Sequence, residues 1–382
     1  MDFELTNRQK QIRLAAREFA EGELVPIGKD CEAKGEFPKH LIKKAAQLGF
    51  IGVFIKKEYG GLGLGLLEHA LILEEFWRAE PGLAQALAQS AFGSDVLLLY
   101  GSEEQKKKYL PPIVKGDWVM AFSITEPEAG SDAASATTTA VRVGDEYVIN
   151  GNKVMISNGS EAKFLLVFFL THPEETSKSK RHSILLVETD RPGYKADKIH
   201  GKMGLRASDT ANIFFNNVRV PKENLVGVEG SGFLQLMDFF DRSRVIIAAH
   251  AVGLAQGAIE QAVNYVKKRK QFGKTIASFQ ITQFKIAEMA TMIETARGLM
   301  YKACWYVDRG TPNTQLSSMA KWWACQAAVR VVDEALQLHG GYGYLDDYPI
   351  ERFYRAAKLL EIYEGTKEIE KIIIGRRILG AT

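Results

Sequence analysis

The spacing of apolar residues changes twice along the chain and divides it into three sections. From residue 1 to about 120, apolar positions recur at helical intervals, as in the segment 12–19 behind Thr6, a residue type that often caps helices. The segment 84–100 is rich in helix-forming residues and apolar on a wide face, which is typical of a helix buried among others. Residues 1–120 are therefore predicted to form an N-terminal α-helical bundle.

Short β-type runs replace the helical pattern near Trp118. Gly144 and Asp145 separate two alternating runs, 141–143 and 147–149, and this arrangement predicts a hairpin. Further strands are expected at 118–125, 154–156, 164–170, 183–187, 211–215 and 218–220. Residues 121–226 are therefore predicted to form a β-sandwich or barrel domain.

Helical periodicity returns at Gly232 and continues to the end of the chain. Long segments joined by short glycine-containing connections cover 232–269, 280–309, 315–339 and 346–358. A terminal helix is expected to begin at the N-cap Thr366 and to stop at Gly380. Residues 227–382 are predicted to form a C-terminal four-helix bundle, so the expected fold class is α+β multidomain, with helical, β and helical sections in that order.

Composition and charge narrow the functional classes. The 382 residues carry a net charge of +3, which is too weak a bias to favour binding to nucleic acid or to a membrane surface. The longest apolar run, 164–170, is too short to span a bilayer. The three cysteines form no CxxC pair, so we expect no zinc or other metal site and a reducing compartment. The polar segment 1–10 predicts no secretory signal, which favours the cytoplasm, or an organelle matrix if the chain is a processed form.

One carboxylate near the end of the chain is a candidate for chemistry. Glu364 lies between Tyr363 and Gly365, directly before the helix that Thr366 is expected to cap. A glycine at the next position lets another molecule approach closely. Taken alone, Glu364 is better explained as an acidic residue that favours the helix dipole.

Other segments can also bind ligands, but each has a simpler explanation. The turn 124–132 offers hydroxyls and free N–H groups that can hold a phosphate or a polar ring edge, or it is an ordinary turn. In 269–274 an arginine can capture a phosphate beside the stacking ring of Phe272, or the cations complement a helix C-terminus. The segment 337–344 permits close approach of a ligand or is a helix end, and the charged run 241–244 is most often a solvated helix face.

Together and in this order, these segments resemble the acyl-CoA dehydrogenases, a family of FAD-dependent flavoproteins, over nearly the whole chain. The matching segments are 58–61, 125–132, 156–159, 204–210, 269–274, 337–341 and 363–366. The resemblance implies helical, β and helical domains and a homotetramer built as a dimer of dimers. It also implies an acyl-CoA substrate and electron-transferring flavoprotein as the electron acceptor.

The resemblance assigns Glu364 as the catalytic base, which removes the α-proton of an acyl-CoA thioester while N5 of the flavin takes the β-hydrogen as hydride. A weakly acidic α-proton needs a base that is close, oriented and shielded from water, and shielding raises the pKa of a carboxylate. The thioester oxygen gains negative charge as the proton leaves. Its hydrogen-bond donors are expected to be the backbone N–H of Glu364 and a ribityl hydroxyl of FAD.

The same resemblance implies the remaining site residues. The isoalloxazine ring is expected to contact Phe122, Ile124, Thr125, Met155 and Ser157. The nucleotide half of FAD, bound across a subunit interface, is expected to contact Arg269, Gln271, Phe272, Gln280, Gln337, Gly340 and Gly341. The residues expected to complete the cofactor site are Thr366 and Glu368. The residues expected to face the CoA thioester arm are Asp241, Arg244, Tyr363, Gly365 and Ser131, the last of which would also touch the FAD pyrophosphate.

Four positions depart from the usual pattern of the family. Met155 replaces an aromatic residue and Ala356 replaces an acid, so packing beside the ring and support of the base loop are expected to differ. Ser243 occupies the position where some branched-chain members carry the base, which strengthens the assignment of Glu364. Glu368 stands where glutamine is common and is expected to alter hydrogen bonding to the flavin.

The acyl group is expected to lie along the segment 82–95, which contains no arginine or lysine. A dicarboxylyl-CoA such as glutaryl-CoA would leave its distal carboxylate unpaired there, which disfavours that substrate. Gln85, Gln89 and Phe92 suggest a modest pocket for a short, branched or alicyclic acyl group. Two alternatives to a dehydrogenase stay open: a non-catalytic flavin- or acyl-CoA-binding protein used for assembly, and an oxidase that passes electrons to oxygen.

Overall fold

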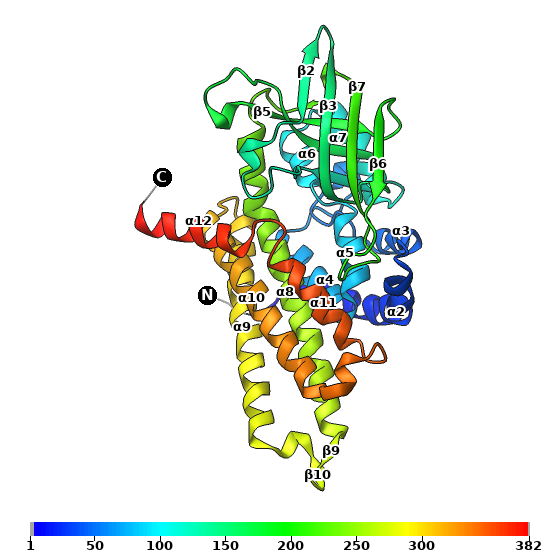
Figure 1. Cartoon of the computed structure of the whole chain (residues 1–382), viewed down its shortest axis with the longest axis vertical. Helices are drawn as coiled ribbons and strands as arrows, with labels where there is room; N and C mark the ends of the chain where they lie inside the picture. Colours follow the sequence, from blue (N-terminus) through cyan, green and yellow to red (C-terminus); the bar gives the residue numbers. More distant parts are fainter. Residues whose placement is uncertain (1–3, 381–382) are drawn as a thin grey trace.

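The computed structural model describes residues 4–380 and has an elongated shape, with a β domain at one end and a long helical bundle at the other (Figure 1). The N-terminal helices, coloured blue to cyan, contact both parts: α4 packs against α8 of the bundle, and Tyr109 of α7 packs its ring on Phe164 of the β domain. This arrangement of helical, β and helical sections confirms the predicted fold class.

The N-terminal section consists of short helices. They are α1 (Asn7–Phe19), the π-helical turn η1 (Ala20–Leu24), α2 (Val25–Lys34), α3 (Lys39–Gln47), the 3₁₀ turn η2 (Lys57–Tyr59), α4 (Leu66–Ala79), α5 (Pro81–Gln89), α6 (Ser94–Tyr100) and α7 (Glu103–Val114). Thr6 caps α1 as predicted, because its side chain accepts a hydrogen bond of 3.2 Å from the backbone N–H of Gln9. The prediction of a single helix over 84–100 is wrong, since the chain turns between α5 and α6 at Gly93, whose φ of +94° suits glycine.

The β domain contains one eight-stranded sheet. Its strands and 3₁₀ turns are β1 (Met120–Ser123), η3 (Ala133–Ser135), β2 (Thr139–Val143), β3 (Glu146–Ser157), β4 (Phe164–Leu170), η4 (Lys178–Lys180), β5 (His182–Glu188), β6 (Tyr194–Lys198), β7 (Thr210–Pro221), η5 (Lys222–Asn224) and β8 (Leu225–Val226). The strand order is β6-β7-β3-β2-β4-β5-β8, and β1 pairs with β4. The predicted hairpin is confirmed, with Val143 paired to Glu146. The runs predicted as separate short strands at 154–156, 211–215 and 218–220 belong to the long, irregular strands β3 and β7.

Strand β4 connects the β core to the helical core. Its side chains alternate between the two: Leu165, Val167 and Phe169 belong to the core of the sheet, whereas Phe164 and Phe168 belong to the core of the helices. Because both faces of β4 are covered, all of its residues are buried and the strand appears in the sequence as an unbroken apolar run.

The C-terminal section is built around one long central helix. Its elements are α8 (Gly232–Lys268), β9 (Lys270–Gln271), β10 (Lys274–Thr275), η6 (Ile276–Ser278), α9 (Gln280–Asp308), α10 (Thr314–His339), η7 (Gly340–Tyr344), α11 (Ile350–Leu360) and α12 (Lys367–Leu379). Helix α8 packs against α4, α9, α10 and α11. It is long and apolar enough to cross a membrane by length and composition, but 83% of its most apolar stretch is buried inside the protein. A helix with this degree of burial is a core helix of the bundle.

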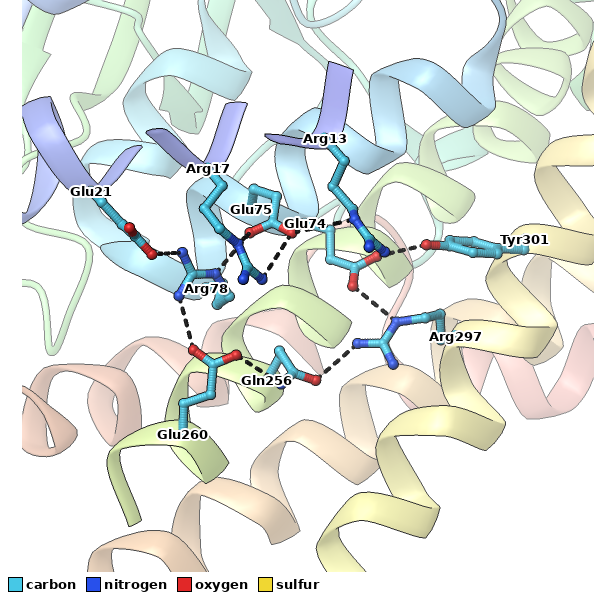
Figure 2. A network of polar contacts seen from close by, with 10 residues as sticks. All are labelled: Arg13, Arg17, Glu21, Glu74, Glu75, Arg78, Gln256, Glu260, Arg297 and Tyr301. Carbon is cyan, nitrogen blue, oxygen red and sulfur yellow. Dashed lines mark hydrogen bonds and ion pairs between the residues drawn. The ribbon is translucent and has the colours of Figure 1, made fainter. Parts of the chain in front are cut away.

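Buried ion pairs join the N-terminal helices to the bundle (Figure 2). Arg78 of α4 reaches Glu75 at 2.8 Å and Glu260 of α8 at 2.9 Å. Arg297 of α9 pairs with Glu74 of α4 at 2.9 Å. These contacts hold α4 against α8 and α9, and α4 and α8 are among the helices that line the cavity described next.

Candidate active site

The loop between α11 and α12 presents Glu364 in a constrained backbone conformation. Glu364 and Gly365 have φ values of +54° and +95°, so two successive residues lie in the left-handed region. A residue with a side chain costs roughly 1 kcal/mol or more in that region, and such strain is often found at functional sites. Thr366 ends the loop as the predicted N-cap of α12 and accepts from the backbone N–H of Ile369 at 3.4 Å.

Several contacts from outside the loop keep it in place. Lys321 of α10 is fully buried and its Nζ donates to the carbonyl of Gly365. Within the loop, the backbone N–H of Lys367 donates to the carbonyl of Glu361 at 3.1 Å, and the buried Glu361 carboxylate pairs with Lys358 at 2.5 Å. Ala356 is buried in α11 with no polar side chain to offer. Lys321 and Glu361 therefore provide the polar support that the sequence left in question at that position.

The carboxylate of Glu364 is half-buried and held by a hydroxyl. Ser243 Oγ on α8 donates a hydrogen bond of 2.8 Å to Glu364 Oε2. Burial raises the pKa of Glu364 to about 7, and the Ser243 hydroxyl together with the cations Arg244 and Lys321 limits that rise. A carboxylate with a pKa near the working pH can act as a general base and keeps a strong affinity for the proton it takes.

A buried ion pair lies directly under the loop. Arg244 Nε is 3.0 Å from Glu370 Oε1, and both side chains are almost fully buried. A Cβ atom on Gly365 would come within 2.1 Å of Glu370 Oε1, so this position requires glycine. The sequence suggested that Gly365 leaves room for another molecule; in the structure that room is taken by the chain's own Glu370.

The other residues expected to face the thioester arm of CoA lie around the loop between α11 and α12, with the exception of Ser131. The Tyr363 hydroxyl is 3.2 Å from Nδ1 of the buried His250. Asp241 is half-buried and accepts from the Thr314 hydroxyl at 2.7 Å. Ser131 belongs to another part of the chain and is exposed in the turn after β1.

A cavity of about 450 Å³ lies next to Ser243. It is lined by α4, α5, α6, α8 and the residues around them, including Phe50, His69, Phe76, Ala88, Phe92 and Ile246. Ser243 lines it, so the hydroxyl that holds Glu364 is also part of the cavity. A cavity lined largely by apolar side chains, next to a carboxylate of raised pKa, can hold the hydrocarbon part of a ligand out of water.

Arg242 changes the argument made from the segment 82–95. It lines the cavity from α8 and supplies a cation that the segment itself lacks. The guanidinium lies 3.7 Å from Asp238. Desolvation raises the pKa of the half-buried Asp95 to about 6, and the charge of Arg242 limits that rise. The argument from the segment 82–95 covers that segment alone, and the cavity as a whole contains one arginine, which already has carboxylate neighbours.

The residues expected around the isoalloxazine ring come together at the end of β1. Phe122, Ile124 and Thr125 follow each other along the chain, and the backbone N–H of Val154 donates to the Thr125 carbonyl at 2.9 Å, which brings Met155 and Ser157 of β3 beside them. Met155 is 72% exposed and has a φ of +58°. The exposed Met155 and the half-buried Phe122 and Ile124 lie next to hydroxyls, and such a surface suits a flat ring with a polar edge, so these residues fit a flavin.

A fully buried lysine holds together the wall formed by these five residues. Lys153 Nζ donates to the carbonyl of Ile124 at 2.9 Å and to Glu126 Oε1 at 2.8 Å. Glu126 in turn accepts from the backbone N–H groups of Thr137 and Thr138. Burial lowers the pKa of Lys153 to about 8, and the Glu126 carboxylate opposes that shift.

The residues expected to bind the nucleotide half of FAD lie far from this wall. Arg269, Gln271, Phe272, Gln280, Gln337, Gly340 and Gly341 are all exposed. They lie at the end of α8, in the β9–β10 hairpin, at the start of α9 and at the end of α10, and the hairpin forms the lower tip of the bundle (Figure 1). The guanidinium of Arg269 lies 5.4 Å from the centre of the Tyr342 ring. Gly341 has no atom within 4 Å of a built Cβ, so packing within this chain does not require a glycine there.

Sequence reasoning missed several residues of the site. Lys321, His250 and Lys153 each contact a site residue from another element, and Ser243 appeared only as a replaced position. Their partners are far away in the sequence, such as the 121 positions between Ser243 and Glu364. The sequence did contain one indication of Lys321 and Lys153, since each lies within an apolar helix or strand. A lysine is buried in such a place only when it has a partner, so each of them pointed to a polar contact.

The comparisons with known proteins agree with this architecture. The acyl-CoA dehydrogenase models match the whole length of the fold: the N-terminal domain at residues 6–117, the middle domain at 121–218 and the C-terminal domain at 230–379. The chain belongs to the acyl-CoA dehydrogenase family. It is therefore an oxidoreductase that acts on the CH–CH bond of acyl-CoA, in a family of flavoproteins.

Three relatives of this acyl-CoA dehydrogenase bear on its chemistry. The acryloyl-CoA reductase (NADH) of Anaerotignum propionicum is 44% identical over 99% of this chain and 96% of that protein. The butyryl-CoA dehydrogenase of Megasphaera elsdenii is 37% identical with a TM-score of 0.95 over 99% of this chain and 100% of the other. A chain in the solved structure of an electron transferring flavoprotein of Acidaminococcus fermentans is 42% identical with a TM-score of 0.96, again over 99% and 100%.

Proposed function

We propose that this acyl-CoA dehydrogenase removes hydrogen from C2 and C3 of a short-chain acyl-CoA to give the trans-2-enoyl-CoA, with Glu364 as the catalytic base. The observation that carries the proposal is the half-buried carboxylate of Glu364, held by a hydroxyl that also lines a cavity of about 450 Å³. When bound, FAD supplies the acceptor for the hydride that leaves C3.

Glu364 takes the proton from C2 of the thioester. Its pKa of about 7 means that a large part of it is ionised at neutral pH, while its proton affinity exceeds that of an exposed glutamate. The backbone N–H of Glu364 donates no hydrogen bond within residues 4–380, so it is free to donate to the thioester oxygen as that oxygen gains charge. Acyl-CoA bound in the cavity excludes water and strengthens both interactions.

The separation of the cofactor residues supports FAD bound between two copies of the chain. Ser243, beside the base, and Arg269 are 26 positions apart along α8 and its C-cap, which corresponds to about 39 Å at 1.5 Å per residue. This length exceeds that of an extended FAD molecule. We therefore expect that one FAD whose ring lies beside the base does not reach Arg269 of the same chain, and we propose that the exposed tip serves a neighbour in a homotetramer built as a dimer of dimers.

Three features support the choice of a short acyl group and of the electron acceptor. The relatives named above act on butyryl-CoA and acryloyl-CoA, which carry four-carbon and three-carbon acyl groups. Of the three residues that suggested a modest pocket, Phe92 lines the cavity, whereas Gln85 and Gln89 are buried in α5 and do not line it. Short branched or alicyclic acyl groups remain part of the proposal. Electron-transferring flavoprotein is proposed as the electron acceptor because a chain in the solved structure of the Acidaminococcus fermentans flavoprotein is similar to this one. The cytoplasm is proposed as the location of the enzyme.

The proposal is tested by mixing the purified protein without oxygen with butyryl-CoA, isobutyryl-CoA, cyclohexanecarboxyl-CoA, glutaryl-CoA and octanoyl-CoA. We expect the yellow flavin colour to be bleached fastest by a short or branched thioester. Colour that no thioester bleaches would support a non-catalytic binding protein, and rapid return of the colour in air would support an oxidase. Acryloyl-CoA added to the reduced protein tests the reverse direction suggested by the reductase relative.

Two variants test the base directly. Glu364→Gln keeps the shape of the side chain and is expected to bind FAD and butyryl-CoA but to lose nearly all flavin reduction. Asp241→Asn is the matched control, because Asp241 is the acid of the CoA arm closest in sequence to Ser243. Full turnover by Glu364→Gln together with loss of turnover in Asp241→Asn would transfer the role of base to Asp241.

A further inference from the structure

A second cavity of about 520 Å³ adjoins the first one and opens to the surface beside the exposed side chains of Leu48 and Leu62. It is bordered by α1, the end of α3 and the segment 62–64, and Ile72 of α4 also faces it. Phe50 and Leu64 line both cavities. The two spaces are therefore separated at these positions by a partition one side chain thick.

Three phenylalanine rings form this partition. Phe50 lies 5.5 Å from Phe19 and 5.7 Å from Phe76, and Phe19 and Phe76 are themselves 5.4 Å apart, measured between ring centres. Phe76 lines only the first cavity and Phe19 only the second, whereas Phe50 faces both. All three are at most 8% exposed, so the rings support one another in a closed cluster.

The first cavity extends from Ser243, which holds the base, to Phe50 and Phe76. We take the methyl end of an acyl chain whose thioester lies at Glu364 to occupy this space, because Ser243 both lines the cavity and holds Glu364. A chain that is too long meets the Phe50 ring, and closely packed aromatic side chains do not give way without loss of contacts. The empty space behind Phe50 is at least as large as the cavity in front of it.

We propose that Phe50 is the specificity-determining residue that closes the far end of the acyl cavity and so limits the length of the acyl chain. A smaller side chain at position 50 joins the two cavities and admits longer chains. The inference rests on the proposed function, because it assumes that the first cavity holds the acyl group. It concerns only the length of the chain and leaves the chemistry at Glu364 unchanged.

The test compares three variants of the holoenzyme: Phe50→Ala, Phe50→Leu and Phe19→Ala. The probes are S-alkyl thioethers of CoA from butyl to tetradecyl, which cannot be oxidised at the flavin because they have no carbonyl group. Their dissociation constants are measured by calorimetry. Phe19→Ala is the matched control, since it removes the same buried ring from the second cavity only. Phe50→Leu covers the case in which the alanine variant does not fold.

In Phe50→Ala we expect the alkyl chain of the best-bound thioether to be longer by two or more carbons than in the wild type. The dissociation constant of the dodecyl probe should fall at least tenfold. Phe50→Leu should show a smaller increase in the preferred chain length. Phe19→Ala is expected to keep the wild-type preference. An unchanged preference in a Phe50 variant that binds the butyl probe normally overturns the inference, as does an equal shift in Phe19→Ala. Bleaching of the wild-type flavin by butyryl-CoA reports separately on the proposed function.

Discussion

Ser243 Oγ donates to Glu364 Oε2 at 2.8 Å, so the hydroxyl on α8 orients the carboxylate that we propose as the base. In some branched-chain members of the family this position of the helix carries the base itself. Here the helix supplies the hydrogen-bond donor and the loop supplies the acid. The bond favours the ionised form of Glu364, whereas burial of the carboxylate disfavours it.

The first prediction concerns the pH dependence of activity. Ser243→Ala removes a donor to the carboxylate, so the pKa of Glu364 is expected to rise further above 7, by about one unit for a hydrogen bond to a charged group. The acid limb of kcat/KM should move to higher pH, with activity lost at pH 6 and nearly retained at pH 9. Ser243→Thr keeps the hydroxyl and is expected to keep the wild-type profile; a shift of the alanine variant toward lower pH would contradict the assignment.

The second prediction concerns stability. The pKa of Glu364 is raised from 4.5 to about 7 on folding, so ionisation of this group costs the folded state about 3 kcal/mol above pH 7 and nothing below pH 4.5. Glu364→Gln removes that cost and is expected to be more stable than the wild type by up to about 3 kcal/mol at pH 8, with no gain near pH 4.5.

Urea denaturation at fixed protein concentration measures this difference. Glu368→Gln is the control, because Glu368 is exposed and its replacement should change the free energy of unfolding by less than about 0.5 kcal/mol. A Glu364→Gln variant that is no more stable than the wild type at pH 8 would show that the carboxylate is not shielded.

The third prediction tests whether two chains share one cofactor site. Arg269→Glu places a negative charge where phosphate binding is proposed, and Glu364→Gln disables the base, so each variant alone is expected to be inactive. When both chains are produced together, a mixed dimer contains one site with an intact Glu364 from one chain and an intact Arg269 from the other. We expect activity and FAD content to return in the mixed protein; a mixture as inactive as its components would contradict a shared site.

The fourth prediction concerns the ion pairs between α4 and the bundle (Figure 2). Arg297→Met leaves Glu74, which is only 5% exposed, without its cation, and the loss is expected to be about 3–5 kcal/mol of unfolding free energy at pH 8. The loss should shrink as the pH falls, because burial already raises the pKa of Glu74 and protonation removes the unpaired charge.

Glu294→Gln is the matched control for Arg297. It removes the exposed partner of the same arginine, so a loss of less than about 1 kcal/mol is expected. The double variant Arg297→Met with Glu74→Gln should regain most of the lost stability. Equal losses for Arg297→Met and Glu294→Gln would show that the buried pair contributes no more than an exposed one.

The secondary structure of this protein followed largely from local patterns. Thr6 and Thr366 marked the helix starts that the structure shows, and Gly144 marked the hairpin, because caps and turns depend on a few neighbouring residues. Strand β6 (Tyr194–Lys198) was not predicted. It lies at the edge of the sheet with no fully buried residue, so its sequence lacks an apolar signal.

The sequence by itself determined the order of helical, β and helical sections, the family and the carboxylate to examine, because periodicity and motifs are local properties. Only the tertiary structure decided that Ser243 holds Glu364, that Lys321 and Lys153 are buried supports, and that Phe50 separates two cavities. The pKa of Glu364 also belongs to the tertiary structure. Burial and charge depend on which side chains, distant in the sequence, come into contact in the fold. The spacing of residues along the chain does not determine those contacts.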